Sequence, residues 1–450
     1  MTKDRLGTIS EDVGQSVRPR AAFTTLGCKL NQFETEQMRQ QLEEAGFVTV
    51  AWGEGADVYV VNSCTVTGRA DRDARRLVRS ARHANPEAVV VLAGCYADAS
   101  PEARAALPEA DLIVPNSEKA HLAERLAERG VSALSVEAGT GACYGGTGPM
   151  VRRFAGHTRA FVKVQEGCDA HCAYCLIPKA RGRAKSVPLE DVERQARALG
   201  DAGHPELVLI GTHLGRYGVD LEPRATLAEL VERLLAIDVV KRLRLSSIEP
   251  IEISEALLDL VARGAGGRIC RHLHVPLQSG CDSVLQRMRR PYLAEEYRAI
   301  VGRCLERVPG LAVGADVIVG FPGETEDDFA ETVAFVEGLP LAYLHVFTYS
   351  PRPGTDAAEM PDQVKPADRK RRNLVLREIG ARKAEAFAAA QVGHELVVVI
   401  EEKLHDGRRI GVSDNYLKVT LPAGDGTLHG LVRVRVTGSE AGGLEGIVCE

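Results

Sequence analysis

Three cysteines between Gly167 and Cys175 have a spacing that suits a metal centre. Cys168, Cys172 and Cys175 follow one another at x3 and x2 intervals, so three thiolates can reach one centre from a single short loop. A four-iron cluster takes four ligands and the loop offers three, which leaves one iron open to a small molecule. Zinc is an alternative, but structural zinc sites are closed and four-coordinate, and His171 can hardly point at the same metal. The spacing favours an iron–sulfur cluster over zinc or a chance grouping.

Three further cysteines, Cys28, Cys64 and Cys95, each follow a short apolar segment and a small residue. These segments alternate with amphipathic helices, which predicts a parallel sheet covered by helices. Ligands of such sheets bind at the carboxyl ends of the strands, where the three cysteines stand. Each cysteine alone would be interpreted as an ordinary buried residue, but three equivalent positions favour a second cluster with an open iron. The strands are predicted at Ala22–Leu26, Asp57–Val61, Ala88–Leu92 and Leu112–Pro115, and the helices at Glu34–Ala45 and Arg69–His83.

A second and more regular alternation of strands and helices occupies residues 157–387. Its six strand–helix units are two short of a closed eight-stranded barrel, which predicts a partial barrel with a lateral mouth. A glycine-rich linker, residues 139–156, separates this domain from the amino-terminal domain, residues 20–138. The strands are predicted at Ala160–Gln165, Glu206–Ile210, Arg242–Ser246, Arg271–Pro276, Val313–Val319 and Ala342–Thr348, and the main helices at Leu189–Ala202, Leu227–Ile237, Ala294–Arg307 and Glu326–Gly338.

Polar and glycine-bearing segments follow the strands of the partial barrel, where barrel enzymes collect their chemistry. A cofactor that carries a ribose, an adenine and an amino acid needs hydroxyl, amide and backbone contacts of this kind. Turns are polar in any case, and His213 on its own is as well explained by capping or packing. The segments are Gly211-Thr212-His213, Ser246-Ser247, Gln278-Ser279-Gly280, Gly320 to Glu324 and Tyr349-Ser350-Pro351.

The last part of the chain, residues 388–450, changes to a two-residue periodicity with turn residues between the runs. This predicts a small antiparallel β-barrel, in the size range of nucleic-acid-binding barrels. Aromatic residues such as Tyr416 are few, so backbone or shape recognition is favoured over base stacking. The preceding helix, Ala367–Gln391, carries the basic run Arg369 to Arg372, which is either a solvated face or a phosphate contact.

The length indicates two or three domains, and the composition is that of a soluble globular protein. The alternation of strands and helices makes its fold class α/β. The chain has 450 residues, of which 45% are hydrophobic and 26% charged, and a net charge of -6. That charge argues against a globally basic nucleic-acid-binding surface, while local patches remain possible. No apolar run is long enough to cross a bilayer or form a signal peptide, and residues 1–19 are expected to be a disordered tail. A cytoplasmic, reducing location is therefore expected, in which cysteines bind metal rather than form disulfides.

The loop Cys-x3-Cys-x2-Cys with Tyr174 before its last cysteine resembles the signature of the radical S-adenosylmethionine enzymes. Together with the amino-terminal cysteines and the carboxy-terminal barrel, it makes nearly the whole chain similar to the methylthiotransferases. The supporting runs are Leu26-Gly27-Cys28-Lys29-Leu30-Asn31-Gln32-Phe33-Glu34-Thr35-Glu36, Val61-Asn62-Ser63-Cys64-Thr65-Val66, Gly94-Cys95, Lys179-Ala180-Arg181-Gly182-Arg183 and Pro276-Leu277-Gln278-Ser279-Gly280.

This resemblance implies two [4Fe–4S] clusters and S-adenosylmethionine as cofactors. One cluster, on Cys168, Cys172 and Cys175, would cleave S-adenosylmethionine to methionine and a 5′-deoxyadenosyl radical. The auxiliary cluster, on Cys28, Cys64 and Cys95, would carry the sulfur that is transferred. The implied S-adenosylmethionine contacts are Tyr174, Gly211, Thr212, Ser246, Gln278 and Gly320. Candidate RNA contacts are Arg181, Arg183, Arg371 and Arg372, for which a role in surface solubility is the alternative.

Within the family, the run after Cys28 is most similar to the branch that methylthiolates carbon 2 of threonylcarbamoyladenosine, next to the anticodon of transfer RNA. Other branches act on isopentenyladenosine in transfer RNA or on an aspartate of a ribosomal protein. A non-catalytic iron–sulfur RNA-binding protein or redox sensor is the alternative from another class. The implied partners are transfer RNA, an electron donor and a sulfur source, with no membrane, and the protein is expected to be a monomer.

Overall fold

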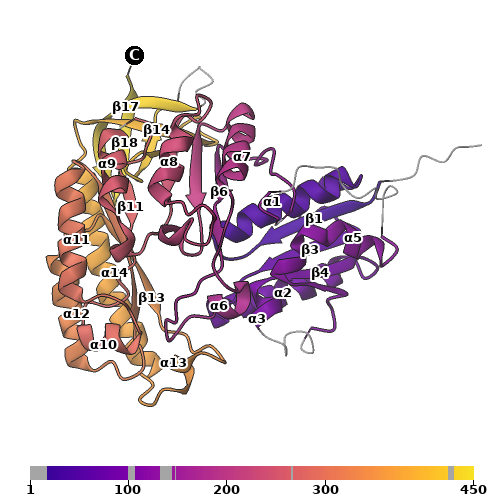
Figure 1. Ribbon diagram of the computed structural model, residues 1–450, viewed down its shortest axis with the longest axis horizontal. Coiled ribbons are helices and arrows are strands. Elements are labelled where there is room, and N and C mark those ends of the chain that lie inside the picture. Colours follow the sequence, from indigo (N-terminus) through magenta and orange to yellow (C-terminus); the bar gives the residue numbers. More distant parts are fainter. Residues whose placement is uncertain are drawn as a thin grey trace, which may run out of the picture.

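The computed structural model describes residues 18–99, 107–131, 144–146, 148–264, 267–423 and 430–449. The predicted tail lies outside these residues up to position 17, as do positions 139–143 and 147 of the predicted linker. Figure 1 shows the amino-terminal part, drawn in indigo and purple, beside a larger body in magenta to yellow. None of the described helices combines the length and the apolar character needed to cross a membrane.

The amino-terminal part is a five-stranded parallel sheet in the order β2-β1-β3-β4-β5. Helix α2 packs on one face and helices α1 and α5 on the other, through two separate apolar cores. The predicted alternation is confirmed, and β2, a three-residue strand at the sheet edge, is the strand it missed. The elements are β1 (Arg20–Thr25), α1 (Lys29–Glu44), β2 (Val48–Val50), β3 (Val58–Ser63), α2 (Gly68–Ala84), β4 (Val89–Gly94), α3 (Cys95–Ala99), β5 (Leu112–Val114), the 3-10 helix η1 (Asn116–His121) and α5 (Leu122–Ala127).

The central part is an arc of six parallel strands. Two three-stranded sheets, β10-β9-β6 and β11-β12-β13, are joined by the parallel bridges Leu243–Ile269 and Ser247–His274. The described residues of β6 and β13 do not pair, so the arc has the lateral mouth that the sequence predicts. Its strands are β6 (Arg159–Lys163), β9 (Glu206–Ile210), β10 (Leu243–Leu245), β11 (His272–His274), β12 (Ala312–Val319) and β13 (Tyr343–Thr348).

Helices cover the outside of this arc, as Figure 1 shows for α11, α12 and α14. The helices are α7 (Leu189–Asp201), α8 (Leu227–Leu235), α9 (Glu255–Gly264), α11 (Ala294–Arg307), α12 (Glu326–Gly338) and α14 (Pro366–Ala389), with the shorter α6 (Ile177–Arg181), α10 (Asp282–Arg287) and α13 (Asp356–Glu359). A two-stranded ribbon, β7 (Gln165–Glu166) and β8 (Lys185–Ser186), and the 3-10 helices η2 (Leu214–Arg216) and η3 (Pro250–Glu252) complete this part.

The amino-terminal part bridges the mouth of the arc. On the β6 side, Glu34 of α1 pairs with Arg181 of α6. On the β13 side, Asp71 of α2 pairs with Arg352, which follows β13, at 2.5 Å. Because both edges of the mouth are held, the strand ends of the amino-terminal sheet face the carboxyl ends of the arc.

The carboxy-terminal part is a closed five-stranded barrel in the order β14-β15-β16-β18-β17, which confirms the predicted small barrel. It differs from the prediction in one pairing, because β16 and β18 run parallel. The sequence predicts its first four strands, at Glu395–Glu401, Gly411–Val412, Leu417–Leu421 and Gly430–Thr437. The last strand was missed because its glycines, Gly443 and Gly446, weaken the strand pattern. Its core joins Val398, Val419 and Val434 to Ala388 at the end of α14. The strands are β14 (Glu395–Lys403), β15 (Arg409–Ser413), β16 (Lys418–Leu421), β17 (Leu431–Glu440) and β18 (Gly443–Val448).

This small barrel covers the amino ends of the arc strands through buried charges. Glu206, at the start of β9, pairs with Arg242 and Arg244, and all three side chains are almost fully buried. The guanidinium of Arg242 donates to the carbonyl of Val397 in β14, and that of Arg244 donates to the carbonyl of Ser413 in β15. Glu206 thus holds the two arginines that tie the carboxy-terminal barrel to the arc.

Replacing Glu206 by glutamine is expected to lower the free energy of unfolding by about 3 kcal/mol at pH 7. Burial alone would raise the pKa of Glu206, but the charges of Arg244 and Arg242 outweigh it and hold the pKa at about 2, below the usual 4.5. The stabilisation is therefore complete above pH 4.5 and is lost as the pH falls towards 2. Urea unfolding of both proteins between pH 7 and pH 3 measures this difference.

The matched control for that experiment is Glu401→Gln. Glu401 pairs with Arg159 in a partly exposed position, so its loss is expected to cost no more than about 1 kcal/mol. A destabilisation by Glu206→Gln that stays constant down to pH 3 would contradict the electrostatic origin of the effect.

Candidate active site

The loop between β7 and α6 carries Cys168, Cys172 and Cys175, here called the loop triad. Gly167 opens the loop with a φ of +71°, and a side chain there would collide with the backbone of Arg183. The amide of Cys168 then donates to the carbonyl of Gly182 at 3.1 Å, which closes the loop on the end of α6. The loop triad is therefore held at its base by a turn that requires glycine.

Hydrogen-bond donors surround the sulfurs of the loop triad. The amide of Ile177 donates to Cys175 Sγ at 3.4 Å. Arg290 Nη1 donates to Cys172 Sγ at 3.4 Å, and His213 Nδ1 lies 3.3 Å from Cys168 Sγ. Donors of this kind stabilise negative charge on cluster sulfurs and tune the reduction potential.

Cys28, Cys64 and Cys95, here called the amino-terminal triad, stand at the carboxyl ends of the neighbouring strands β1, β3 and β4. A Cβ on Gly27, whose φ is +91°, would lie 2.7 Å from Cys64 Sγ. A Cβ on Gly94 would lie 2.5 Å from the carbonyl oxygen of Ser63. The structure thus brings the three cysteines together, and the residues before them are small because the strand ends approach one another this closely.

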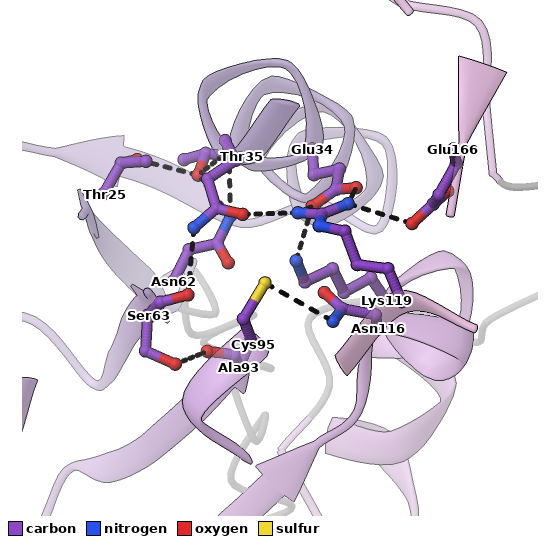
Figure 2. Close-up of polar contacts among 12 residues, drawn as sticks. Thr25, Glu34, Thr35, Asn62, Ser63, Ala93, Cys95, Asn116, Lys119 and Glu166 are labelled. Atoms are coloured by element: carbon purple, nitrogen blue, oxygen red, sulfur yellow. Dashed lines mark hydrogen bonds and ion pairs between the residues drawn. The ribbon is translucent and has the colours of Figure 1, made fainter. Parts of the chain in front are cut away.

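The donors around the amino-terminal triad come from two sides. The amide of Val66 lies 3.5 Å from Cys64 Sγ. Asn116 Nδ2 lies 3.8 Å from Cys95 Sγ (Figure 2). The same nitrogen also donates to the carbonyl of Ala180 in α6, at 2.8 Å. Asn116 therefore links the amino-terminal triad to the helix that follows the loop triad.

Both triads fit iron–sulfur clusters better than single metal ions. Tetrahedral zinc with sulfur ligands would place the sulfurs about 3.8 Å apart. Among the described residues, one group of three metal-ligating side chains has all its ligand atoms within 4.8 Å of one another, and it consists of His274, Asp316 and His345. The sulfurs of the two cysteine triads do not meet this limit. A cluster spreads its thiolates further apart than one ion does.

One buried thiol in each triad, Cys64 and Cys175, has a pKa that favours its protonated form. Burial raises the pKa of Cys64 to about 11 and that of Cys175 to about 12. Iron binding must therefore displace protons from these thiols, which couples assembly of the clusters to pH.

A cavity of about 230 Å³, here called the central cavity, lies between the two triads. Cys95 of the amino-terminal triad and Cys175 of the loop triad both contribute to its wall. Most of the remaining wall is apolar, so bound reactants would be shielded from water. Its other lining residues are Thr65, Val66, Thr67, Tyr174, Leu176, Ile177, Ala180, Gln278, Asp316, Ile318, Phe347, Thr348, Tyr349, Ser350 and Arg352.

A polar space of about 180 Å³, here called the side pocket, adjoins the central cavity. Asp316 and Phe347 line both spaces. Burial alone would raise the pKa of Asp316, but hydrogen bonds from His274 and His345 hold it at about 2. The other lining residues are Lys29, Ser246, Ser247, His272, Tyr343 and Tyr416.

The predicted S-adenosylmethionine contacts fall into two groups. Tyr174 and Gln278 line the central cavity, whereas Ser246 lines the side pocket. The hydroxyl oxygens of Thr212 and Ser246 are buried and have no hydrogen-bond partner among the described residues, nor has that of Tyr349. Unpartnered buried hydroxyls are expected where a polar ligand binds.

The two glycines predicted to contact the cofactor differ in their surroundings. Gly320 has a φ of +74°, and the side chain of Arg369 fills the space where its Cβ would be. A Cβ on Gly211, at the end of β9, would lie 3.2 Å from Gln165. Packing within the protein therefore accounts for the glycine at position 320, whether or not a cofactor binds near it.

Two of the predicted RNA contacts are wrong. The side chain of Arg181 is 1% exposed and pairs with Glu34 and Glu166. Arg372 is equally enclosed and pairs with Glu324. These guanidinium groups are committed to buried carboxylates, so they do not reach RNA. Arg183, which is 95% exposed, and Arg371, which is half exposed, remain candidates.

The burial of Arg181 creates a charge network across the junction of the two parts, shown in Figure 2. Glu34 accepts from Arg181 Nη1 at 2.7 Å and from Lys119 Nζ at 2.5 Å, and Lys163 Nζ lies 3.8 Å from it. Glu166 adds a second carboxylate to Arg181 at 2.9 Å. The network fixes α1, which begins beside Cys28, against α6, which follows Cys175.

Several residues that act on the triads were missed from the sequence. Asn116 and Arg290 contact sulfurs from segments that have no motif of their own. His213 lies beside Cys168, and its Nε2 is 2.9 Å from Glu252 Oε1. Only His213 had a usable signal, its place directly after a predicted strand.

Two family models match the chain. Residues 20–115 match the uncharacterized protein family UPF0004, and residues 162–336 match the radical SAM superfamily. The matched ranges contain the amino-terminal triad and the loop triad, respectively.

Relatives resemble the chain over nearly its full length. It is 38% identical over 427 residues to the threonylcarbamoyladenosine tRNA methylthiotransferase MtaB of Bacillus subtilis, covering 92% of this chain and 93% of that protein. It is 38% identical over 389 residues to the MtaB of Aquifex aeolicus, covering 85% and 93%. It is 32% identical over 445 residues to the tRNA-2-methylthio-N(6)-dimethylallyladenosine synthase of Moorella thermoacetica, covering 96% and 99%.

Solved structures share the fold. The radical S-adenosylmethionine methyltransferase TsrM of Kitasatospora setae, solved with cobalamin and a [4Fe–4S] cluster, superposes with a TM-score of 0.55 at 17% identity. The match covers 76% of this chain and 77% of that one. It supports the α/β fold of the matched part of the chain.

Proposed function

Because the chain belongs to the tRNA methylthiotransferase family of radical S-adenosylmethionine enzymes, we propose that its two cysteine triads hold the two clusters of the reaction. The protein is a transferase that adds a methylthio group to carbon 2 of threonylcarbamoyladenosine in tRNA. The relatives with that activity are up to 38% identical, against 32% for the dimethylallyladenosine enzyme of Moorella thermoacetica. The run Gly27-Cys28-Lys29 favours the same branch.

The cofactors are S-adenosylmethionine and two [4Fe–4S] clusters. When bound, one cluster supplies the electron that cleaves S-adenosylmethionine and the other supplies the sulfur that is transferred. We assign the first role to the loop triad and the second to the amino-terminal triad. The observation that carries this assignment is the wall of the central cavity, which contains Cys95 of one triad and Cys175 of the other.

The side chains around the cavity have three tasks in this assignment. Arg290 and His213 hold the sulfurs of the loop triad, and Asn116 holds Cys95. The apolar wall excludes water from a reaction whose reactive species must attack an unactivated C–H bond. The unpartnered hydroxyls of Thr212 and Tyr349 are available to polar groups of the cofactor.

The remaining assignments extend this proposal. Tyr174, Gly211, Thr212, Gln278 and Gly320 contact S-adenosylmethionine, and the exposed Arg183 and Arg371 contact RNA phosphates. The protein works as a cytoplasmic monomer with three domains, residues 20–138, 157–387 and 388–450. An electron donor and a sulfur source complete its set of partners.

Deletion of the gene is expected to remove the methylthio form of threonylcarbamoyladenosine from tRNA and to leave the unmethylthiolated nucleoside in its place. Mass spectrometry of tRNA nucleosides from the deletion strain, with and without the restored gene, measures both. Loss of a methylthio group from dimethylallyladenosine or from a ribosomal protein instead would contradict the assigned substrate.

A further inference from the structure

The side pocket is placed to receive the substituent on N6 of the substrate adenine. Asp316 and Phe347 line both spaces, so the side pocket continues from the central cavity. In adenine, N1 lies between carbon 2 and carbon 6, and carbon 6 carries N6, so carbon 2 and N6 share one edge of the base. A base whose carbon 2 lies between the two triads therefore directs its N6 substituent towards a neighbouring space, and the side pocket is such a space.

Lys29 places an ammonium group at this pocket that has no hydrogen-bond or ion-pair partner among the described residues. It is the first residue of α1 and directly follows Cys28, and its side chain contributes to the pocket wall. Among the described residues, no acceptor lies within hydrogen-bond or ion-pair distance of its ammonium group. An enclosed ammonium group without a counter-ion is unfavourable, so the pocket suits an anionic ligand group.

The charged groups around Lys29 do not already supply a free anion. They include the cations Arg159 and Arg244, and the carboxylate of Glu206 is paired with Arg242 and Arg244. Asp316 is the carboxylate of the pocket, but it lies at the junction with the central cavity and is engaged by His274 at 2.9 Å and His345 at 3.3 Å. Lys29 lines the side pocket and is not among the residues that line the central cavity. The hydroxyl of Ser246, which is buried and has no partner, provides a second polar contact in the same pocket.

We propose that Lys29 binds the threonyl carboxylate of threonylcarbamoyladenosine in the side pocket and thereby selects this nucleoside. The inference rests on the proposed function. The threonylcarbamoyl group ends in a carboxylate, which forms a charge-assisted hydrogen bond with an ammonium group. A dimethylallyl group has no charge and would leave the partly buried Lys29 without a partner. Ser246 donates its hydroxyl to the carbamoyl carbonyl.

The test compares two anticodon stem–loop RNAs, one with threonylcarbamoyladenosine and one with its threonyl methyl ester. The ester removes the negative charge and keeps the rest of the nucleoside. Binding of both RNAs to the full-length protein is measured by fluorescence anisotropy, and kcat/KM is measured with the reconstituted enzyme. The variants are Lys29→Met, Lys29→Arg and, as a matched control, Lys241→Met, since Lys241 is exposed and far along the chain.

The wild-type protein and Lys241→Met are expected to bind the acid about 10- to 100-fold more tightly than the ester. In Lys29→Met this ratio falls to near one, and Lys29→Arg restores part of it. The proposal would be overturned if Lys29→Met bound both RNAs more weakly by the same factor. It would also be overturned if the wild-type protein bound the acid and the ester with equal affinity. A wild-type enzyme that binds the acid but forms no methylthio product from either RNA would instead overturn the assigned function.

Discussion

Replacing Cys172 by alanine abolishes the reductive cleavage of S-adenosylmethionine, and with it the methylthiolation of tRNA. Cys172 is one of three thiolates in the loop triad, and a cluster with three protein ligands has none to spare. Its Sγ also accepts from Arg290, so the variant leaves that guanidinium without its sulfur partner. Reverse-phase chromatography of 5′-deoxyadenosine and methionine, after anaerobic reduction of the reconstituted protein, measures the loss.

Replacing Cys64 by alanine gives a different result. Cys64 belongs to the amino-terminal triad, so the variant retains some cleavage of S-adenosylmethionine but inserts no sulfur. Each variant is expected to hold about half of the wild-type iron, because each loses one of the two clusters. Cys449→Ala, which changes a cysteine outside both triads, serves as the control and keeps both activities.

The two cysteine variants together test the division of labour between the triads. Equal loss of cleavage and sulfur insertion in both would argue against separate roles. Zinc in either triad of protein purified without oxygen would contradict the chemistry altogether.

Replacing Glu34 by glutamine has the largest expected effect on stability. The side chains of Glu34, Arg181, Lys119 and Lys163 are all 5% exposed or less. Without the charge of Glu34, Arg181 and Lys163 keep only the carboxylate of Glu166, and Lys119 loses the carboxylate with which it pairs. Removing one partner of a buried ion pair typically costs 3–5 kcal/mol, and about that loss in the free energy of unfolding is expected here.

The stabilisation by Glu34 is expected to decrease as the pH falls. Burial alone would raise the pKa of Glu34, but the charges of Arg181, Lys119 and Lys163 hold it well below its usual value of 4.5. The stabilisation by Glu34 is thus complete above pH 4.5 and declines as the pH falls below that value. Chemical unfolding of wild type and Glu34→Gln at pH 7 and pH 4 measures it.

Glu124→Gln is the control for the Glu34 variant, because Glu124 forms an exposed pair with His121 in the same domain. Its expected effect is within about 0.5 kcal/mol. If Glu34→Gln were as stable as the control, the buried network would not be holding the amino-terminal part across the mouth of the arc.

Local patterns in the sequence predicted most elements of the fold. The run Glu206–Ile210 is apolar after its first residue, and strand β9 has the predicted bounds. Helices α11 and α12 also have the predicted bounds. The start of α12 is marked by Thr325, whose side chain accepts a hydrogen bond from a backbone amide of the first turn. Strands β2 and β18 were missed, the first because it has three residues and the second because glycines interrupt it.

The metal-binding cysteines of the candidate site could be predicted from their positions in the sequence, but the contacts of the buried arginines could not. The loop triad could be grouped because its cysteines have metal-ligand spacing, and the amino-terminal triad because each cysteine follows an apolar segment and a small residue. The roles of Arg181 and Arg372 could not be read in this way, because a basic residue near a loop looks the same whether it is buried or exposed. The carboxylate that buries Arg181 lies 147 residues earlier in the chain. Likewise, nothing near Arg242 indicates that it holds the carbonyl of Val397.

The dimensions of the central cavity constrain how RNA presents its nucleotide. With about 230 Å³ between the triads, there is room for a base and part of a cofactor but not for a folded hairpin loop. The adenosine must therefore leave the stack of its neighbours and swing outward before any chemistry begins. Extruding a base costs a few kcal/mol, least where it is already poorly stacked, so loop flexibility in the RNA contributes to the choice of substrate.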